Sequence, residues 1–196
     1  MFDLPTSVCI QGEQFSIRND GDYRMVLDCF SAMQDEKLTE EERIIVPLTI
    51  FYDTIQSVDD LDNLPDIKEA IEQMYLFFNC GQEDKGVQNN KKHYKLIDWK
   101  EDEQLLASAI NNVANTEIRS LPYLHWWTFM GYYNAIGECA LSNIVSIRYK
   151  RITNKKLEKY EREFINDNPQ YFMNDARSIE QRENDELLKQ IWNKGE

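Results

Sequence analysis

The chain has 196 residues, 42% of them apolar, with only seven glycines and five prolines; this suits one helix-rich domain, or one domain with an appendage, and disfavours a many-turned β-sandwich. Thirty-five Asp and Glu against 22 Lys and Arg give a net charge of −13, which disfavours binding to nucleic acid or to an anionic membrane surface. The acidity is compatible with plain solubility and with a DNA mimic, and composition favours solubility.

The first predicted element is a small β-hairpin. Apolar residues alternate within 8–17 on either side of a turn that contains Gly12. The polar residues 19–22 can then cap a helix whose apolar positions are spaced over 23–33. The first residues of the chain have neither a cationic start nor a long apolar core, so we expect no signal peptide.

A second helix is predicted after Thr39. Thr39 and Glu42 have the spacing of a capping box, and an apolar stripe follows at 44–55. Pro47 lies within that stripe, so it either kinks this helix or starts another one.

A third helix is predicted over 67–78. The pair Pro65-Asp66 opens it, its apolar residues repeat at helical spacing, and Gly81 caps its end. The polar stretch 82–92 is the best candidate for a flexible or disordered loop.

Two more helices are expected in the middle of the chain. Asp98 or Asp102 can cap a helix over 105–113. Pro122 is then expected to start an aromatic helix that Gly137 ends.

The last helices complete a fold class that is mainly α. Residues 141–148 suggest a short helix, and 178–192 suggest a polar helix with a thin apolar edge. We predict a compact helical domain with an N-terminal β-hairpin over residues 1–150 and a helical C-terminal extension over 151–196. The thin edge of that extension needs a partner helix, in cis or in another subunit.

The most unusual segment is 125–133, in which nearly every residue is aromatic, large and apolar, or small. A helix that is apolar nearly all round is normally buried, so a core helix is favoured over a ligand groove. His125 has no Ser, Cys or Asp at a local spacing that would make it catalytic, which favours a structural residue at a helix start. His93 has even less support as a catalytic residue.

No catalytic, cofactor or metal site is expected. The two histidines are 32 positions apart and there is no Cys-x-x-Cys pair, so zinc has no recognisable ligand set. No glycine-rich phosphate-binding motif is present either. The scattered cysteines are expected to be free buried thiols: Cys9, Cys29, Cys80 and Cys139.

Residues 148–162 form the one locally basic stretch, with seven Lys and Arg. An acidic partner or a nucleic acid could bind there. Glu158 and Glu161 interrupt the cations and apolar residues give the stretch an edge, so a solvated amphipathic helix is favoured.

The aromatic segment also carries a family resemblance. Residues 124–129 read Leu-His-Trp-Trp-Thr-Phe, and with the later stretch 141–148, which ends in Ile-Arg, they resemble the signature of the bacteriophage "Gp-fifteen" family. These are small proteins encoded among the tail genes of long-tailed phages and prophages of Gram-positive bacteria. Weaker similarities, including the Asp-Tyr-Arg step at 22–24, extend the resemblance over about residues 4 to 150. The signature residues, read as structural, are Arg24, His125, Trp126, Phe129 and Arg148.

The resemblance implies a non-enzymatic tail morphogenesis protein in the cytoplasm of the bacterial host. Such a gene commonly lies just before the tape-measure gene, where tail assembly chaperones are encoded, so tape-measure and tail-tube proteins are the expected partners and self-association is an option. A structural virion component, such as a connector or completion protein, and an acidic inhibitor or DNA mimic are the alternatives. The candidate partner contacts are apolar residues without another explanation: Trp127, Leu188 and Trp192.

Overall fold

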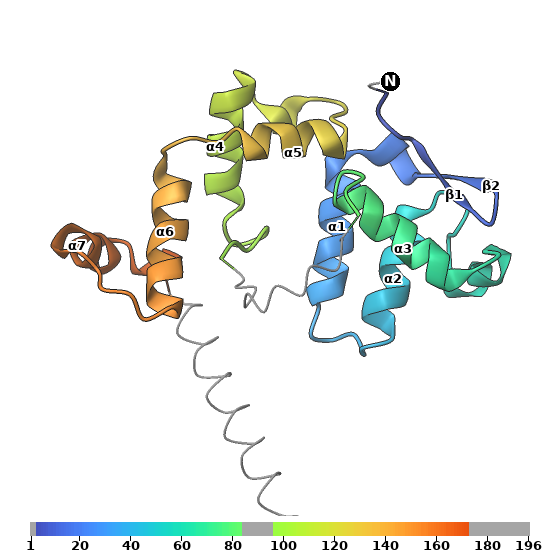
Figure 1. The fold of residues 1–196 in the computed structure, drawn as a ribbon, viewed down its shortest axis with the longest axis horizontal. Coiled ribbons are helices and arrows are strands. Elements are labelled where there is room, and N and C mark those ends of the chain that lie inside the picture. The colour runs from blue at the N-terminus through green and yellow to red at the C-terminus, as the bar shows by residue number, and fades with distance from the viewer. Residues whose placement is uncertain (1–2, 84–95, 173–196) are drawn as a thin grey trace, which may run out of the picture. The chain divides into compact units, whose positions relative to one another are not determined.

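The computed structural model describes residues 3–83 and 96–172, which are mainly helical with one N-terminal β-hairpin (Figure 1). This confirms the predicted fold class, while the helix predicted at 178–192 lies outside the described residues. The strands and α-helices are β1 (Ser7–Ile10), β2 (Glu13–Ser16), α1 (Tyr23–Gln34), α2 (Glu42–Phe51), α3 (Ile67–Phe78), α4 (Glu103–Ala114), α5 (Trp126–Asn134), α6 (Ala140–Ile152) and α7 (Lys159–Asp167). Short 3-10 turns lie at η1 (Arg18–Gly21), η2 (Val58–Asn63), η3 (Ile118–Ser120) and η4 (Pro169–Tyr171).

The chain divides into two compact units. Among the described residues, the first unit contains 3–83 and 110–136, and the second contains 96–109 and 137–172. The hairpin, α1, α2, α3 and α5 belong to the first unit, α6 and α7 belong to the second, and α4 contributes residues to both. The predicted domain boundary after residue 150 stays a prediction.

Aromatic rings form the centre of the first unit. Phe51 of α2 packs edge-on against Phe77 and Phe78 of α3, with ring centroids 5.4 and 5.6 Å apart. In the hairpin, β1 and β2 pair antiparallel with Val8 opposite Phe15, and the Phe15 side chain is buried. Edge-to-face rings of this kind add to the free energy gained by burying their area.

A smaller cluster forms the core of the second unit. Ile144 and Ile147 of α6 are buried together with Phe172, and Leu157 and Phe164 pack against them. The i, i+3 spacing of the two isoleucines places them on one side of α6.

The predicted helix starts are confirmed where polar side chains cap them. Asp22 accepts a backbone N–H at the start of α1 and Asp66 does the same at the start of α3. Thr39 and Glu42 form the predicted reciprocal capping box before α2, with distances of 3.2 and 2.8 Å. The hydrogen bonds from Thr39 lower the pKa of the Glu42 carboxyl, because they favour its ionised form.

The bounds predicted for the aromatic helix are wrong at both ends. The helix starts at Trp126 rather than at Pro122. Backbone hydrogen bonds hold Leu124 in place beside the start of α1, so the chain stays extended until His125. The helix ends at Asn134, three residues before Gly137, and the N–H of Ile136 then bonds the carbonyl of Tyr133, three residues back, in a tighter final turn.

The sequence predicts one amphipathic helix over the basic stretch 148–162, and this prediction is wrong. Helix α6 ends at Ile152, and α7 begins at Lys159. Asn154 has a φ of 53°, and the N–H of Lys155 bonds the Lys150 carbonyl at 2.8 Å. A left-handed residue with such a bond is a helix stop signal, and Asn tolerates it better than most residues.

Pro47 does not start a second helix, because it lies inside α2. Arg18, for which the sequence predicts no role, caps the C-terminal end of α2. Its guanidinium donates four hydrogen bonds of 2.8–3.1 Å to backbone carbonyls at and beyond the last turn of α2, which otherwise have no intrahelical partner. The accepting residues are Thr49, Ile50, Tyr52 and Ile55.

The four cysteines are free thiols, as predicted, but they are not all buried. Cys29 is buried, Cys80 and Cys139 are half-buried, and Cys9 is exposed on the hairpin. Strand β1 alternates its side chains, and Cys9 lies on the outer side next to the buried Ile10.

Candidate functional site

The His-Trp-Trp signature lies in the first unit, where the start of α5 contacts the end of α3 and the N-terminal segment. His125 is the N-cap residue of α5, and its Nδ1 accepts the N–H of Trp127 at 3.0 Å. Its Nε2 lies 3.0 Å from the carbonyl oxygen of Pro5, and donation to that carbonyl requires the tautomer with the proton on Nε2. The histidine therefore ties the N-terminal segment to the start of α5 and works in the neutral form.

The two tryptophans complete the end of another helix. The indole Nε1 of Trp127 donates to the carbonyl of Phe77 at 2.9 Å, and that of Trp126 donates to the carbonyl of Phe78 at 3.0 Å. These carbonyls belong to the last two residues of α3, where no further helical N–H follows. The adjacent tryptophans thus fasten the start of α5 to the end of α3.

Asp22 and Arg24 fix the same segment to α1. The Asp22 carboxylate accepts the N–H of Leu124 at 2.9 Å and forms a 3.0 Å ion pair with Arg24. Arg24 also donates to the carbonyl of Leu121 at 2.6 Å. The Asp-Tyr-Arg step and the His-Trp-Trp block, about a hundred residues apart in sequence, are therefore parts of one network.

Only one side of α5 is buried. Trp126 and Phe129 stack at 5.4 Å and are 1% and 3% exposed, and Tyr23 of α1 stacks on Phe129 at 4.6 Å. Trp127 is half-buried, and its ring packs over Gly81, where an added Cβ would lie 3.1 Å from the indole. The predicted core role therefore holds for one face of the helix, while Gly131 and Asn134 are exposed on another.

The comparison with protein families decides what this network marks. A model of the family described as "Bacteriophage Gp15 protein" matches residues 1–172, nearly nine tenths of the chain. The chain belongs to this family. No curated protein and no solved structure matches the sequence. The match extends the "Gp-fifteen" resemblance past residue 150 and through the end of the described second unit.

Arg148 holds the second unit of this Gp15-family chain together. Its guanidinium forms a two-pronged ion pair with Asp102, at 2.6 and 2.9 Å, and both side chains are at most 9% exposed. It also donates to the carbonyls of Leu96 and Tyr171. The sequence marked Arg148 as a signature residue, but Asp102 only as a helix cap, because nothing in the spacing of 46 residues pairs them.

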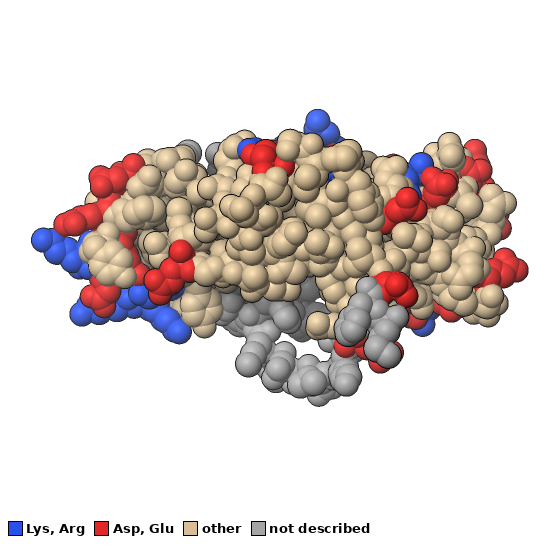
Figure 2. All heavy atoms as spheres, turned by 90° about the horizontal axis from the view of Figure 1, so that it is seen from above, with Lys and Arg blue, Asp and Glu red and all other residues tan. Residues whose placement is uncertain are grey.

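The exposed side of the aromatic segment is a candidate interaction surface. Residues 120–136 contain no Lys, Arg, Asp or Glu, although 29% of the chain is charged. We call their solvent-facing side chains the uncharged face (Figure 2, where the atoms over α5, seen from above, are almost all tan). They include Ser120, Pro122, Tyr123, Gly131, Asn134 and Ala135. Aromatic residues with few charges are the composition of protein–protein interface centres.

The other candidate residues have different outcomes. Trp127 lies beside this face, but its N–H and much of its ring are used within the fold, so its role as a partner contact stays a prediction. Leu188 and Trp192 lie outside the described residues. In the part of the chain that the structure describes, no three His, Cys, Asp or Glu side chains gather as a metal site would need. None of the helices described there is long and apolar enough to cross a membrane.

The His125 cap predicts a pH dependence of stability. Burial lowers the pKa of His125 below the ordinary 6.5, although the Pro5 carbonyl and Asp22 act in the other direction. The unfolded chain then binds the proton more readily than the folded chain, so the contribution is complete above pH 6.5 and is lost as pH falls below it. The free energy of unfolding should therefore fall between neutral pH and about pH 5, measured by urea denaturation.

His125→Asn is the matched control for this prediction. Asn can still accept the N–H of Trp127 but does not titrate, so its stability should change less over the same pH range. His125→Ala removes the cap and should lose about 1 kcal/mol at neutral pH. Equal pH slopes for the wild-type chain and His125→Asn would show that His125 does not contribute.

Proposed function

We propose that this protein is a non-enzymatic tail assembly chaperone that binds the tape-measure protein and tail-tube subunits in the cytoplasm of the bacterial host. The observation that carries the proposal is the match to the bacteriophage Gp15 family over residues 1–172. Genes of this family commonly lie next to the tape-measure gene, the position at which tail assembly chaperones are encoded. A tape-measure protein presents long amphipathic helices, which need a partner to cover their apolar sides before assembly.

The uncharged face is the surface at which we expect the tape-measure protein to bind. It is fixed rigidly, because the buried side of the same segment is held by the hydrogen bonds of His125, Trp126 and Asp22. A preformed surface loses less conformational entropy on binding than a mobile one. Tyr123, 45% exposed, offers a large ring to an apolar helix, while its hydroxyl donates to the carbonyl of Asp20 at 3.0 Å.

The test is co-expression of the full chain with the tape-measure protein encoded beside it. We expect the chain to increase the soluble yield of the tape measure and to co-purify with it. Gly131→Glu should abolish both effects, because it places a charge on the uncharged face where an added Cβ meets no atom within 4 Å. Gly131→Ala is the matched control, since it adds no charge and raises helix propensity.

Three outcomes would contradict the proposal. An unchanged tape-measure yield without co-purification would show that the chain is not its chaperone. Finding the chain as a stoichiometric component of purified phage particles would favour a connector or completion protein instead. Capture of a host enzyme in place of tail proteins would favour the acidic inhibitor or DNA mimic.

A further inference from the structure

The chain separates its charges by region. Residues 3–83 carry 18 Asp and Glu against five Lys and Arg, a net charge of −13. Residues 148–162 carry seven Lys and Arg against two Glu, a net charge of +5. A strong local reversal in a very acidic chain creates a field that can orient an acidic partner.

Three of the seven cations are used inside the second unit, and one of them, Arg151, donates to the carbonyl of Phe172 at 3.3 Å. Arg148 pairs with the buried Asp102, and Lys150 pairs at 2.6 Å with Glu161, which is 3% exposed. The second pair also neutralises Glu161, one of the two Glu residues of the stretch. The cations that remain on the surface are therefore in excess there.

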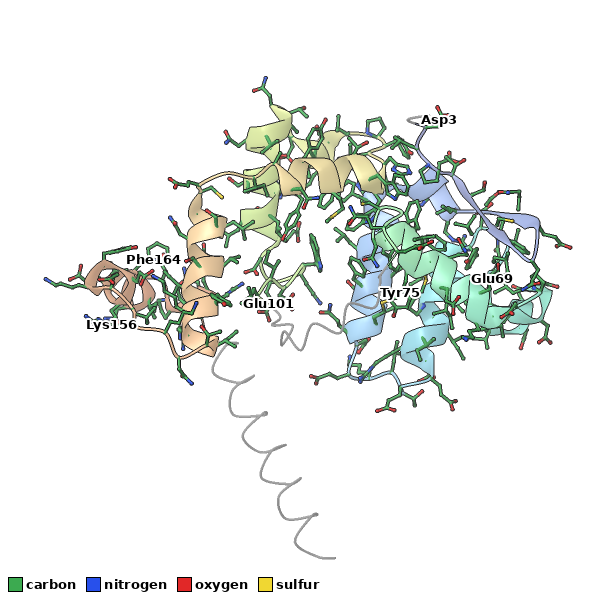
Figure 3. The ribbon with its side chains drawn as sticks, viewed as in Figure 1. Asp3, Glu69, Tyr75, Glu101, Lys156 and Phe164 are labelled. Carbon is green, nitrogen blue, oxygen red and sulfur yellow. The ribbon has the colours of Figure 1, made fainter. Side chains whose placement is uncertain are left out.

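We call the outward side of this stretch the basic face. Glu158 is exposed within it, and Glu163 of α7 lies 3.7 Å from Lys159. Figure 2 shows blue atoms there interleaved with red ones, and Figure 3 labels Lys156 beside α7. Its members, all exposed, are Tyr149, Lys155, Lys156, Lys159, Tyr160 and Arg162.

The basic face combines its cations with exposed rings. Tyr160 is 67% exposed, and the Nζ of Lys155 lies 4.6 Å from the ring centroid of Tyr149. Tyr160 also borders an open hollow of about 440 Å³, whose lining includes Ile147 and Phe164 but also the carboxylates of Glu161, Glu163 and Asp167. Tyr and Arg are enriched at protein–protein interfaces, whereas Lys is depleted there, so the exposed rings and Arg162 are the most favourable contacts that the basic face offers.

We infer that the basic face binds residues 53–67 of a second copy of this chain. That segment contains five Asp and no Lys or Arg. It also exposes two aliphatic side chains, Val58 at 56% and Ile67 at 43%. The exposed carboxylates of Asp59 and Asp62 complement the Lys and Arg side chains of the basic face, and the aliphatic residues complement its exposed rings. The other three carboxylates act within the fold: Asp60 and Asp66 accept backbone N–H groups, and Asp53 lies 3.9 Å from Arg18.

The charge balance favours protein over nucleic acid as the occupant. A nucleic acid would meet a chain with a net charge of −13, whose field repels a phosphate backbone at longer range. The acidic segment of another copy carries five Asp within residues 53–67, so its negative charge is concentrated in one short segment. If the two copies contact each other reciprocally, with each basic face on the other copy's acidic segment, a two-fold dimer results; a contact made in one direction only produces a closed ring or an open chain of copies. This inference concerns the chain alone and does not depend on the tape-measure role.

The test is sedimentation velocity of the purified full chain over a concentration series, with three double variants. We expect the wild type to associate into dimers or larger species as its concentration rises. Lys156→Glu/Lys159→Glu and Asp59→Lys/Asp62→Lys should each weaken this association by at least about tenfold, because each turns an attractive contact into a repulsive one. An equimolar mixture of these two variants should associate again, since the reversed charges then complement each other.

Lys37→Glu/Lys100→Glu is the matched control, because it changes net charge by the same amount at exposed positions that belong neither to the basic face nor to residues 53–67. It should associate like the wild type. A wild type that stays monomeric at all concentrations overturns the inference, as does a mixture of the two variants that stays monomeric. Oligonucleotide binding by a monomeric wild type, lost in Lys156→Glu/Lys159→Glu, would assign the basic face to nucleic acid instead.

Discussion

Replacing Arg148 with Met should destabilise the second unit by about 3–5 kcal/mol, because it leaves the Asp102 carboxylate buried without its counter-charge. Asp102 is 1% exposed, and its contact with Arg148 is two-pronged. The substitution also removes the donors to the carbonyls of Leu96 and Tyr171. The loss can be measured by urea denaturation followed by circular dichroism, and faster amide hydrogen exchange in α6 would locate it.

A double variant and a surface pair make this expectation specific. Arg148→Met/Asp102→Leu removes both charges and should recover much of the stability, since an apolar pair has no unpaired charge to bury. Glu163→Ala breaks the exposed ion pair with Lys159 and should change stability by no more than about 0.5 kcal/mol. A loss for Arg148→Met as small as that for Glu163→Ala would show that the buried pair does not stabilise the unit.

Local patterns in the sequence predicted the parts of the fold that depend on neighbouring residues. Capping residues such as Asp22, Thr39 and Asp66 act within three positions of themselves, so their spacing was sufficient to place three helix starts. The hairpin turn at Gly12 is equally local, since its φ of +85° is one that glycine adopts at no steric cost.

Contacts between distant residues account for what the sequence analysis missed. Leu124 stays extended, against the helix predicted from Pro122, because Asp22 and Tyr23 bond its backbone from about a hundred residues away. The partners of Arg18 and Arg148 are likewise far apart in sequence and are backbone carbonyls or a single carboxylate, which leave no periodic pattern. The aromatic segment is recognisable in the sequence as a family signature. Its exposed, uncharged side can be identified only once the structure shows which of its side chains are buried.

Replacing Trp126 with Ala should cost about 3–5 kcal/mol of stability, which is the usual range for removing a large aromatic side chain from a core. Trp126 is 1% exposed, stacks on Phe129 and meets the ring of Phe30 edge-on at 5.7 Å. Its indole also donates to the carbonyl of Phe78 at the end of α3. Urea denaturation of the full chain measures the loss.

The neighbouring tryptophan separates the hydrogen bond from the packing. Trp126→Phe keeps much of the apolar volume but removes the donor to the buried end of α3, so it should cost about 1–3 kcal/mol. Trp127→Phe removes the same kind of donor from Phe77, but that carbonyl also accepts the N–H of Cys80 at 3.0 Å, and Trp127 is only half-buried. Its cost should therefore stay below about 1 kcal/mol. A loss for Trp126→Phe no larger than that for Trp127→Phe would contradict this expectation, since the bond to Phe78 would then contribute no more than the bond to the doubly bonded Phe77 carbonyl.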